Sequence, residues 1–247
     1  MIFRSLSIET LSYCNRRCAT CLRQAEPDKE ARADRSKRVP LPGKMVMSLI
    51  DQSYDMGFRG VVSLSYYNEP LYDERIHRFG RYAKQTGEFK RVQLCTNGDR
   101  LNKETAKRLD GCFDMIWVSL YDHSPKETRK GLRGLFSKTR LMFTSGLHQR
   151  THQETEHGMQ WILDKRCNHV STNMIVAYNG DVLACCEEIV PHFGLGNVHD
   201  TSLKTAWENK QELVQDLLQP GGRRLYPYCM TCLRTRTVKP QYEVVPA

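Results

Sequence analysis

The stretch that decides the fold is ETLSYCNRRCATCLRQ, Glu9 to Gln24, in which three cysteines follow a run that alternates like a β-strand. They are Cys14, Cys18 and Cys21, in the spacing Cys-x3-Cys-x2-Cys. A [4Fe–4S] cubane takes four thiolates, so three from one short loop leave one iron open to another ligand. The alternative is a structural zinc site, which uses four protein ligands, and no fourth ligand is evident nearby.

The composition points to a metal protein of a reducing compartment. The ten cysteines of this 247-residue chain lie in tight clusters, which are more often metal sites than disulfides when no signal peptide is evident. The N-terminal sequence MIFRSLSIET has no apolar run, and no segment has the composition of a membrane span, so we expect a cytoplasmic protein. The formal charge of +9 favours an anionic partner, or simply a solvated basic surface.

The first two thirds of the chain alternate between strand-like and helix-like patterns. This alternation predicts an α/β fold in which a parallel sheet curves like an incomplete barrel, with helices outside it. The expected strands are rich in apolar or β-branched residues and cover Arg4 to Thr10, Val61 to Tyr66, Arg91 to Cys95, Ile116 to Tyr121 and Thr139 to Thr144. The expected helices cover Lys44 to Met56, Glu74 to Thr86 and, after an N-cap at Asn102, Lys103 to Leu109.

Several polar motifs follow these strands directly. They are Cys14, YYNEP at Tyr66 to Pro70, TNGD at Thr96 to Asp99 and SLYD at Ser119 to Asp122. Because the carboxyl ends of parallel strands meet at one edge, we expect these motifs to converge on one mouth. The charged segment Gln24 to Gly43 is expected to form a long loop beside it.

A second unit is expected after the alternation fades. We predict a core domain of residues 1–158 and a small α+β domain of residues 159–247. The second domain should contain a hairpin that turns at Asn179-Gly180 and one helix from Ser202 to about Leu218.

The second domain carries its own group of cysteines. Cys167, Cys185, Cys229 and Cys232 could ligate one cubane completely, which suits electron transfer or structure, and a zinc ribbon is the alternative. Cys186 could replace Cys185, although adjacent residues rarely reach the same metal. Cys95 and Cys112 are interpreted as small buried apolar residues.

These motifs together resemble the radical SAM superfamily. In that superfamily, a three-cysteine loop follows the first strand, and S-adenosylmethionine binds the open iron. Asn68 and Glu69 lie where the superfamily carries its Gly-Gly-Glu motif, while Asn97 and Ser119 match positions that line the ribose and carboxylate of the cofactor. The C-terminal part resembles the auxiliary-cluster domain called SPASM, in its shortened "twitch" form, through a set that includes Gly180, Gly196, Asn197 and Trp207.

The resemblance implies an enzyme with two [4Fe–4S] clusters and S-adenosylmethionine. Within the superfamily the chain is most similar to 2-deoxy-scyllo-inosamine dehydrogenases, through NEP, TNGD and NGDVLACCEE. This similarity implies a two-electron oxidation of a small, polar, aminocyclitol-type alcohol, with a flavodoxin- or ferredoxin-type electron donor and no membrane. Counting back from Cys167, it also implies Arg150 as a substrate-binding group and possible base.

Other functions remain open from the residues alone. Two sets of basic residues could bind phosphate, which would favour radical modification or isomerisation of a nucleobase substituent in DNA or a nucleotide. Peptide maturation ranks lower, and a metal-binding nucleic-acid module is the non-enzymatic alternative. The basic residues are Arg32, Arg35, Lys37 and Arg38 in the long loop, and Arg223, Arg224, Arg234 and Arg236 around the last cysteine pair.

Overall fold

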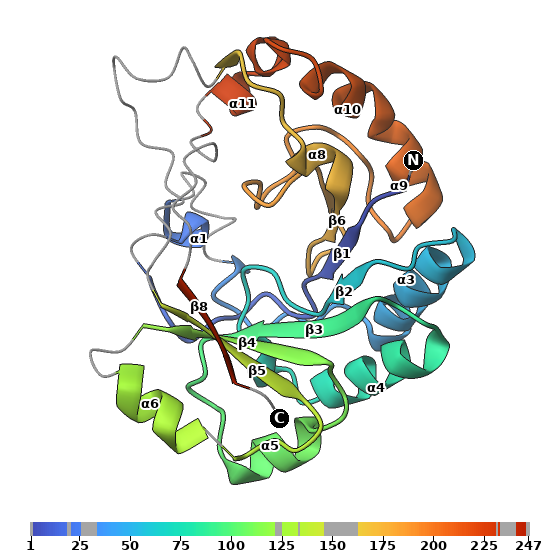
Figure 1. Ribbon diagram of the computed structural model, residues 1–247. Helices are drawn as coiled ribbons and strands as arrows, with labels where there is room; N and C mark the ends of the chain where they lie inside the picture. The colour runs from blue at the N-terminus through green and yellow to red at the C-terminus, as the bar shows by residue number, and fades with distance from the viewer. Residues whose placement is uncertain are drawn as a thin grey trace.

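The computed structural model describes residues 2–18, 21–25, 34–121, 125–132, 134–145, 163–230, 232 and 241–245. Its strands form one eight-stranded sheet in the order β7-β6-β1-β2-β3-β4-β5-β8 (Figure 1). All neighbours from β6 to β5 are parallel, and the two outer pairs are antiparallel. The strands are β1 (Ser5–Ile8), β2 (Val61–Ser63), β3 (Arg91–Thr96), β4 (Met115–Leu120), β5 (Arg140–Ser145), β6 (Asn173–Val176), β7 (Val182–Leu183) and β8 (Gln241–Val245).

Helices connect the parallel strands, as the alternating pattern predicts. They are α1 (Leu22–Ala25), α3 (Gly43–Asp55), α4 (Ile76–Thr86), α5 (Lys103–Leu109) and α6 (Pro125–Leu132), with the 3₁₀ turn η1 (Pro70–Tyr72). The C-terminal part adds α8 (His169–Thr172), α9 (Leu203–Asn209), α10 (Gln211–Leu217), η2 (Gly222–Leu225) and α11 (Pro227–Met230). In Figure 1 the sheet curves, with α3, α4 and α5 grouped beside β3, β4 and β5, and α9 and α10 continuing the arc beyond α3.

The two faces of the sheet differ in burial. Along β3 and β4 the residues alternate between half-buried and buried, which is the period of two expected of a strand. The buried set, which includes Leu94 and Val118, belongs to one continuous core with residues of α3, α4 and α5. Half-buried Gln93, Cys95 and Trp117 therefore lie on the opposite, inner face of the curved sheet.

The predicted fold class is confirmed, and four details of the sequence prediction are corrected. Strand β2 ends at Ser63 instead of Tyr66, and the strand β8 was not foreseen. Cys112 is buried as expected, whereas Cys95 is only half-buried. The predicted single helix from Ser202 is two helices. The helix is interrupted at Lys210, which follows the last residue of α9 and precedes α10.

The C-terminal unit is joined to the core sheet through its hairpin. Strand β6 pairs in parallel with β1, and β7 pairs with β6. Gly180 makes the predicted turn with φ +89°, and a Cβ there would lie 2.5 Å from the Asn197 side-chain oxygen. The predicted domain boundary at residues 158 and 159 lies outside the described residues and stays a prediction. In the part of the chain that the structure describes, no helix is long and apolar enough to cross a bilayer.

Candidate iron–sulfur and cofactor site

The first part of the loop that carries the first three cysteines, Tyr13 to Cys18, is held against the loop after β3. The side-chain amide of Asn97 donates from Nδ2 to Oδ1 of Asn15 at 2.8 Å. The side-chain amide of Asn15 in turn donates from Nδ2 to the Asp99 carboxylate at 2.7 Å. Arg16 also donates to Asp99 from Nε at 2.7 Å, and these bonds hold the pKa of that carboxyl below its usual range. The first cysteine loop and the TNGD motif therefore meet at one edge of the sheet, as predicted.

Glu69 connects the loops after β2 and β3. Its carboxylate, 2% exposed, accepts bonds from the Thr96 hydroxyl at 2.6 Å, the Asn97 backbone N–H at 2.7 Å and the Leu71 N–H at 3.1 Å. Its own N–H donates to the Tyr13 carbonyl at 2.8 Å. Burial raises the pKa of Glu69 to about 7, although these three bonds oppose the shift. The carboxylate thus holds the loops after β2 and β3 together, and its contact with the cofactor's ammonium stays a prediction.

Asn68 offers a donor that the fold leaves unused. Its side-chain oxygen accepts from the Tyr66 N–H at 2.9 Å, whereas its buried Nδ2 has no hydrogen-bond partner among the described residues. A buried amide without a partner costs free energy, and such groups mark positions where a ligand can supply the missing acceptor. The carboxylate of an amino-acid ligand has the required chemistry.

Tyr66 and Tyr67, of which Tyr67 stands with Asn68 in place of the superfamily's glycines, hold the auxiliary loop, which we define as Cys185 to Ile189. The Tyr66 hydroxyl donates to the carbonyl of Cys185 at 3.1 Å and to that of Glu188. The Tyr67 hydroxyl donates to the carbonyl of Cys186 at 3.0 Å. These hydrogen bonds tie the segment after β2 to the auxiliary loop.

The thiols of the first loop lie close enough to influence one another. Burial raises the pKa of Cys14 to about 11, and the negative charges of Glu69 and Cys21 add to this effect. Burial and the charge of Cys21 also raise the pKa of Cys18. Neighbouring thiols with raised pKa values stay protonated on their own. A bound cation or cluster would stabilise them as thiolates.

The second cysteine group is assembled from three segments. Burial, then Cys167 and Cys232, raise the pKa of Cys229 to about 12. Burial raises the pKa of Cys185, with contributions from Cys186 and Cys232. The N–H of Cys167 donates to the Leu217 carbonyl at 2.7 Å, which ties this cysteine to α10.

The two neighbouring cysteines of this group face different surroundings. Cys186 packs with Ile175, Ala177 and Leu183, and its thiol lies 3.8 Å from a Glu187 carboxylate oxygen. Cys185 interacts electrostatically with Cys232, another member of the second cysteine group. This interaction favours Cys185 as the metal ligand.

The two cysteine groups supply thiols, which are the ligands that iron–sulfur clusters use. Within the described ranges, no group of three or more Cys, His, Asp or Glu side chains is arranged to hold a metal ion. Cubane ligands bind different iron atoms and need not converge on one point, as the ligands of a single zinc ion must. The thiols of each group nevertheless interact electrostatically, and all seven predicted ligands lie in the two groups.

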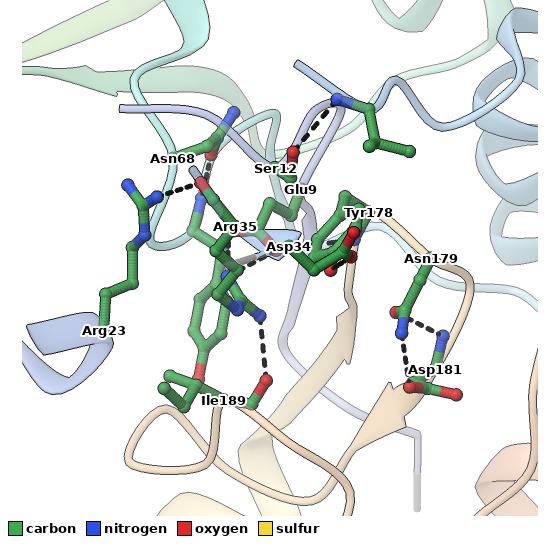
Figure 2. Close-up of polar contacts among 12 residues, drawn as sticks. Glu9, Ser12, Arg23, Asp34, Arg35, Asn68, Tyr178, Asn179, Asp181 and Ile189 are labelled. Atoms are coloured by element: carbon green, nitrogen blue, oxygen red, sulfur yellow. Dashed lines mark hydrogen bonds and ion pairs between the residues drawn. The ribbon is translucent and has the colours of Figure 1, made fainter. Parts of the chain in front are cut away.

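Arg35 was expected among exposed basic residues, but its side chain is buried. The guanidinium donates to both carboxylate oxygens of Glu9, at 2.8 and 3.0 Å, and to the Ile189 carbonyl at 2.8 Å. Figure 2 shows the Arg35 side chain reaching from Glu9 to the auxiliary loop. The Arg35 guanidinium also lies over the Tyr178 ring, 5.2 Å from its centre. An ion pair with Glu9 replaces the phosphate contact considered from the sequence.

The remaining predicted site residues have different outcomes. The half-buried Ser119 lies at the end of β4 and accepts a long bond from the Thr144 hydroxyl at 3.4 Å. Arg150 lies outside the described residues, as do the arginines at 32, 234 and 236. Sequence reasoning missed the roles of Tyr66 and Asp99, although both lie inside motifs that it singled out.

The C-terminal cysteine group coincides with a known domain family. The model for the iron–sulfur cluster-binding domain SPASM matches residues 167–233. This segment is a SPASM domain. Its span includes the four predicted auxiliary ligands, the hairpin β6–β7 and the helices α9 and α10.

Relatives extend the similarity beyond the SPASM domain. A Niallia circulans S-adenosyl-L-methionine-dependent 2-deoxy-scyllo-inosamine dehydrogenase is 22% identical, over 94% of this chain and 93% of its own. A structure of BtrN with AdoMet and 2-DOIA shares the fold, with TM-score 0.74 and 20% identity over 94% of each chain. Native anSMEcpe with AdoMet has TM-score 0.59 and 12% identity over 92% of this chain and 87% of its own.

These findings agree with the sequence prediction. The resemblance to radical SAM enzymes with an auxiliary iron–sulfur domain is confirmed, as is the fold class. The predicted enzyme class and its cofactors, iron–sulfur clusters with S-adenosylmethionine, are confirmed at the level of the family. The substrate is a separate question.

Proposed function

We propose that this chain is a radical SAM dehydrogenase that oxidises a secondary alcohol of a small, polar, aminocyclitol-type molecule. The observation that carries the proposal is the position of Tyr66 to Glu69 between the two cysteine groups. The hydroxyls of Tyr66 and Tyr67 donate hydrogen bonds to the auxiliary loop. The backbone N–H of Glu69 donates to the backbone carbonyl of Tyr13, the residue before Cys14. These four consecutive residues thus connect two loops. One would hold the cluster that starts the radical reaction, and the other would hold a cluster that can receive an electron.

The bound groups supply the difficult chemistry. When bound, S-adenosylmethionine and the first cluster would supply radical chemistry at a C–H bond, and the second cluster would supply a one-electron acceptor. Cys14, Cys18 and Cys21 would hold the first cluster, and the cysteines at 167, 185, 229 and 232 the second.

The chain's own residues would position the cofactor and substrate. The Asn68 Nδ2 group, which has no partner among the described residues, would donate to the cofactor's carboxylate, and Glu69 would receive its ammonium. Gln93, Trp117 and Ser119 present polar groups on the inner face of the sheet, where the Trp117 indole donates to Gln93 at 3.1 Å. Such groups suit a substrate with several hydroxyls. Arg150 stays a candidate for the group that receives the hydroxyl proton.

The nucleic-acid alternative loses support from the described arginines. Arg35 is in an ion pair and Arg223 is buried, donating to the Lys165 carbonyl at 3.3 Å. Arg224 is paired with Asp164 at 3.0 Å, and Arg38 lies over the Tyr13 ring. These side chains take part in the fold's own contacts, so the basic charge does not by itself indicate a nucleic-acid partner.

The test uses the full chain, reconstituted anaerobically with iron and sulfide and supplied with dithionite and S-adenosylmethionine. Mass spectrometry would follow 5′-deoxyadenosine with a panel of aminocyclitols and, separately, with nucleic acid carrying modified thymines. We expect 5′-deoxyadenosine and ketone in equal amounts from one aminocyclitol. The Cys14, Cys18 and Cys21 to Ala variant is the matched control and should form neither product.

Two results would refute the proposal. Stimulation of 5′-deoxyadenosine by nucleic acid alone would assign a nucleic-acid-modifying enzyme. Consumption of an aminocyclitol with a product of unchanged mass would assign a redox-neutral isomerase, because a dehydrogenation removes two hydrogens.

A further inference from the structure

Lys210 is a buried lysine that the proposed chemistry does not use. Its side chain is fully buried, at 0% exposure, where α9 ends and α10 begins. The ammonium donates to the backbone carbonyl of Asn173, the first residue of β6, at 2.5 Å. It also lies 5.5 Å from the centre of the Trp207 ring. The interruption of the expected helix at this residue therefore places a cation inside the SPASM domain.

The described surroundings do not neutralise this cation. An ammonium has three donors, and burying a charge is costly unless it is paired. One bond to a neutral carbonyl is present, and among the described residues no carboxylate lies within ion-pair distance of Lys210. Burial lowers the pKa of Lys210 to about 8, with the nearby acidic groups opposing the shift, so the group remains mostly protonated at neutral pH.

The acidic groups that act on the ammonium are those of the second cysteine group. The β6–β7 register pairs Ile175 with Leu183, so the same register brings Asn173, whose carbonyl holds the ammonium, opposite Cys185 two positions further on. The groups whose negative charge favours the protonated lysine are Cys185, Glu188, Cys186 and Cys167. The Glu188 carboxylate oxygens accept from the N–H groups of Ala184 and His192 and form no ion pair with Lys210 among the described residues. Neutral thiols offer little compensation, whereas a cubane with four thiolates carries about two negative charges in its oxidised form and about three when reduced. An anionic cluster at this site would supply the counter-charge that Lys210 lacks.

We propose that Lys210 is a positioning residue whose fixed positive charge raises the reduction potential of the auxiliary cluster. A nearby cation stabilises the reduced, more negative form of a cluster more than the oxidised form. Lys210 acts through the cluster and takes no proton from substrate.

This inference deepens the proposed dehydrogenase function and rests on it for its purpose. In the oxidation, the carbon-bound hydrogen atom goes to the 5′-deoxyadenosyl radical, the hydroxyl proton goes to a base, and one electron remains to be removed. That electron goes to the auxiliary cluster, which a cation makes a better acceptor. Carbon thereby loses two electrons in total, and the alcohol becomes a ketone.

The experiment is a redox titration of the auxiliary cluster followed by electron paramagnetic resonance. It uses the reconstituted full chain and, to isolate one signal, the same chain with Cys14, Cys18 and Cys21 changed to Ala. Lys210→Met removes the charge, Lys210→Gln removes it but retains a donor for Asn173, and Lys210→Arg keeps it. Lys204→Met is the matched control, because Lys204 lies on α9, the helix that ends at Lys210, and its side chain is 71% exposed.

At a fixed potential, we expect the neutral variants to raise the ratio of oxidised to reduced auxiliary cluster at least tenfold, which corresponds to about 59 mV for one electron. Lys210→Arg and Lys204→Met should stay within about twofold of the parent chain. Loss of auxiliary iron from both neutral variants but not from Lys210→Arg would support the same charge effect. An unchanged ratio with full iron, or iron loss from Lys210→Arg as well, would overturn the proposal.

The potential separates this inference from the proposed function. If no aminocyclitol yields a ketone, the titration still reports whether Lys210 tunes the cluster. If a ketone forms while the potential is insensitive to Lys210, the dehydrogenase stands and this inference fails.

Discussion

Arg35 and Glu9 form a buried ion pair of 2.8 Å that joins the segment before α3 to the end of β1, with side-chain exposures of 3% and 0%. Arg35 also donates to Ile189 in the auxiliary loop, and the Tyr178 N–H donates to Glu9 at 3.4 Å. The pair therefore connects the core sheet with the segment after β6, through Tyr178, and with the auxiliary loop after β7, through Ile189. It thereby holds the auxiliary loop against the end of β1, which leads into the first cysteine loop.

Removing one partner of this pair should be strongly destabilising. Arg35→Met leaves the Glu9 carboxylate buried without its cation, and such changes cost about 3–5 kcal/mol. We expect this loss in the free energy of unfolding by anaerobic urea denaturation, with a fall in auxiliary iron. Lys37→Met is the control, because Lys37 forms an exposed pair with Asp34 and should cost about 0–1 kcal/mol. Equal losses from both variants would contradict the role given to Arg35.

Replacing Tyr66 and Tyr67 with Phe should loosen the auxiliary loop without emptying the first cluster site. Each change removes a hydroxyl donor and leaves carbonyls of the loop unpaired, at a cost of about 1–3 kcal/mol. In the double variant we expect a normal first-cluster signal, less auxiliary iron and more 5′-deoxyadenosine than ketone. Tyr82→Phe is the control, since the Tyr82 hydroxyl donates to Asp51 away from this loop. A double variant with full auxiliary iron and unchanged coupling of the two products would refute this role.

The sequence predicts the periodic and motif-bearing parts of this protein well. The apolar alternation of residues such as Leu94 and Val118 fixes the strands, and Gly180 fixes the hairpin, because these signals are local. Asn97 hydrogen-bonds to Asn15, so the loops after β1 and β3 lie side by side. The sequence predicted that these loops would converge, because the carboxyl ends of parallel strands share one edge of the sheet.

Long-range pairing explains what the sequence did not reveal. Arg35 looks like a solvated loop residue until Glu9, 26 positions earlier, is placed beside it. Lys210 lies in an unbroken helical pattern, so its inward side chain could not be read from neighbouring residues. The contacts of Tyr66 and Tyr67 are with a loop more than 100 residues away, so the neighbouring sequence does not reveal them.

The identity of the auxiliary ligand can be decided between two neighbouring cysteines. Cys186 packs among apolar side chains, whereas Cys185 interacts with Cys232. Cys185→Ala should therefore lose the auxiliary cluster, while Cys186→Ala should retain it. Iron and sulfide analysis with electron paramagnetic resonance measures this after reconstitution. Retention in Cys185→Ala and loss in Cys186→Ala would exchange their assignments.

Glu69→Gln should weaken the brace between the loops after β2 and β3. Both carboxylate oxygens accept from donors, so an amide NH₂ in place of one oxygen faces another donor. We expect a loss of about 1–3 kcal/mol in the free energy of unfolding, with weaker S-adenosylmethionine binding by equilibrium dialysis. Glu127→Gln is a control on α6, where the exposed Glu127 should leave both quantities unchanged.

The same substitution should change how stability depends on pH. Burial raises the pKa of Glu69 from 4.5 to about 7, so the folded state binds this proton more tightly than the unfolded state does. The resulting stabilisation is complete below pH 4.5 and is lost as the pH rises through about 7, by at most about 3 kcal/mol. Glutamine cannot ionise, so the stability advantage of the parent chain over Glu69→Gln should shrink between about pH 5 and pH 7.5. Urea unfolding at both pH values measures it, and an advantage that grows with pH would show that the folded carboxyl is instead stabilised in its ionised form.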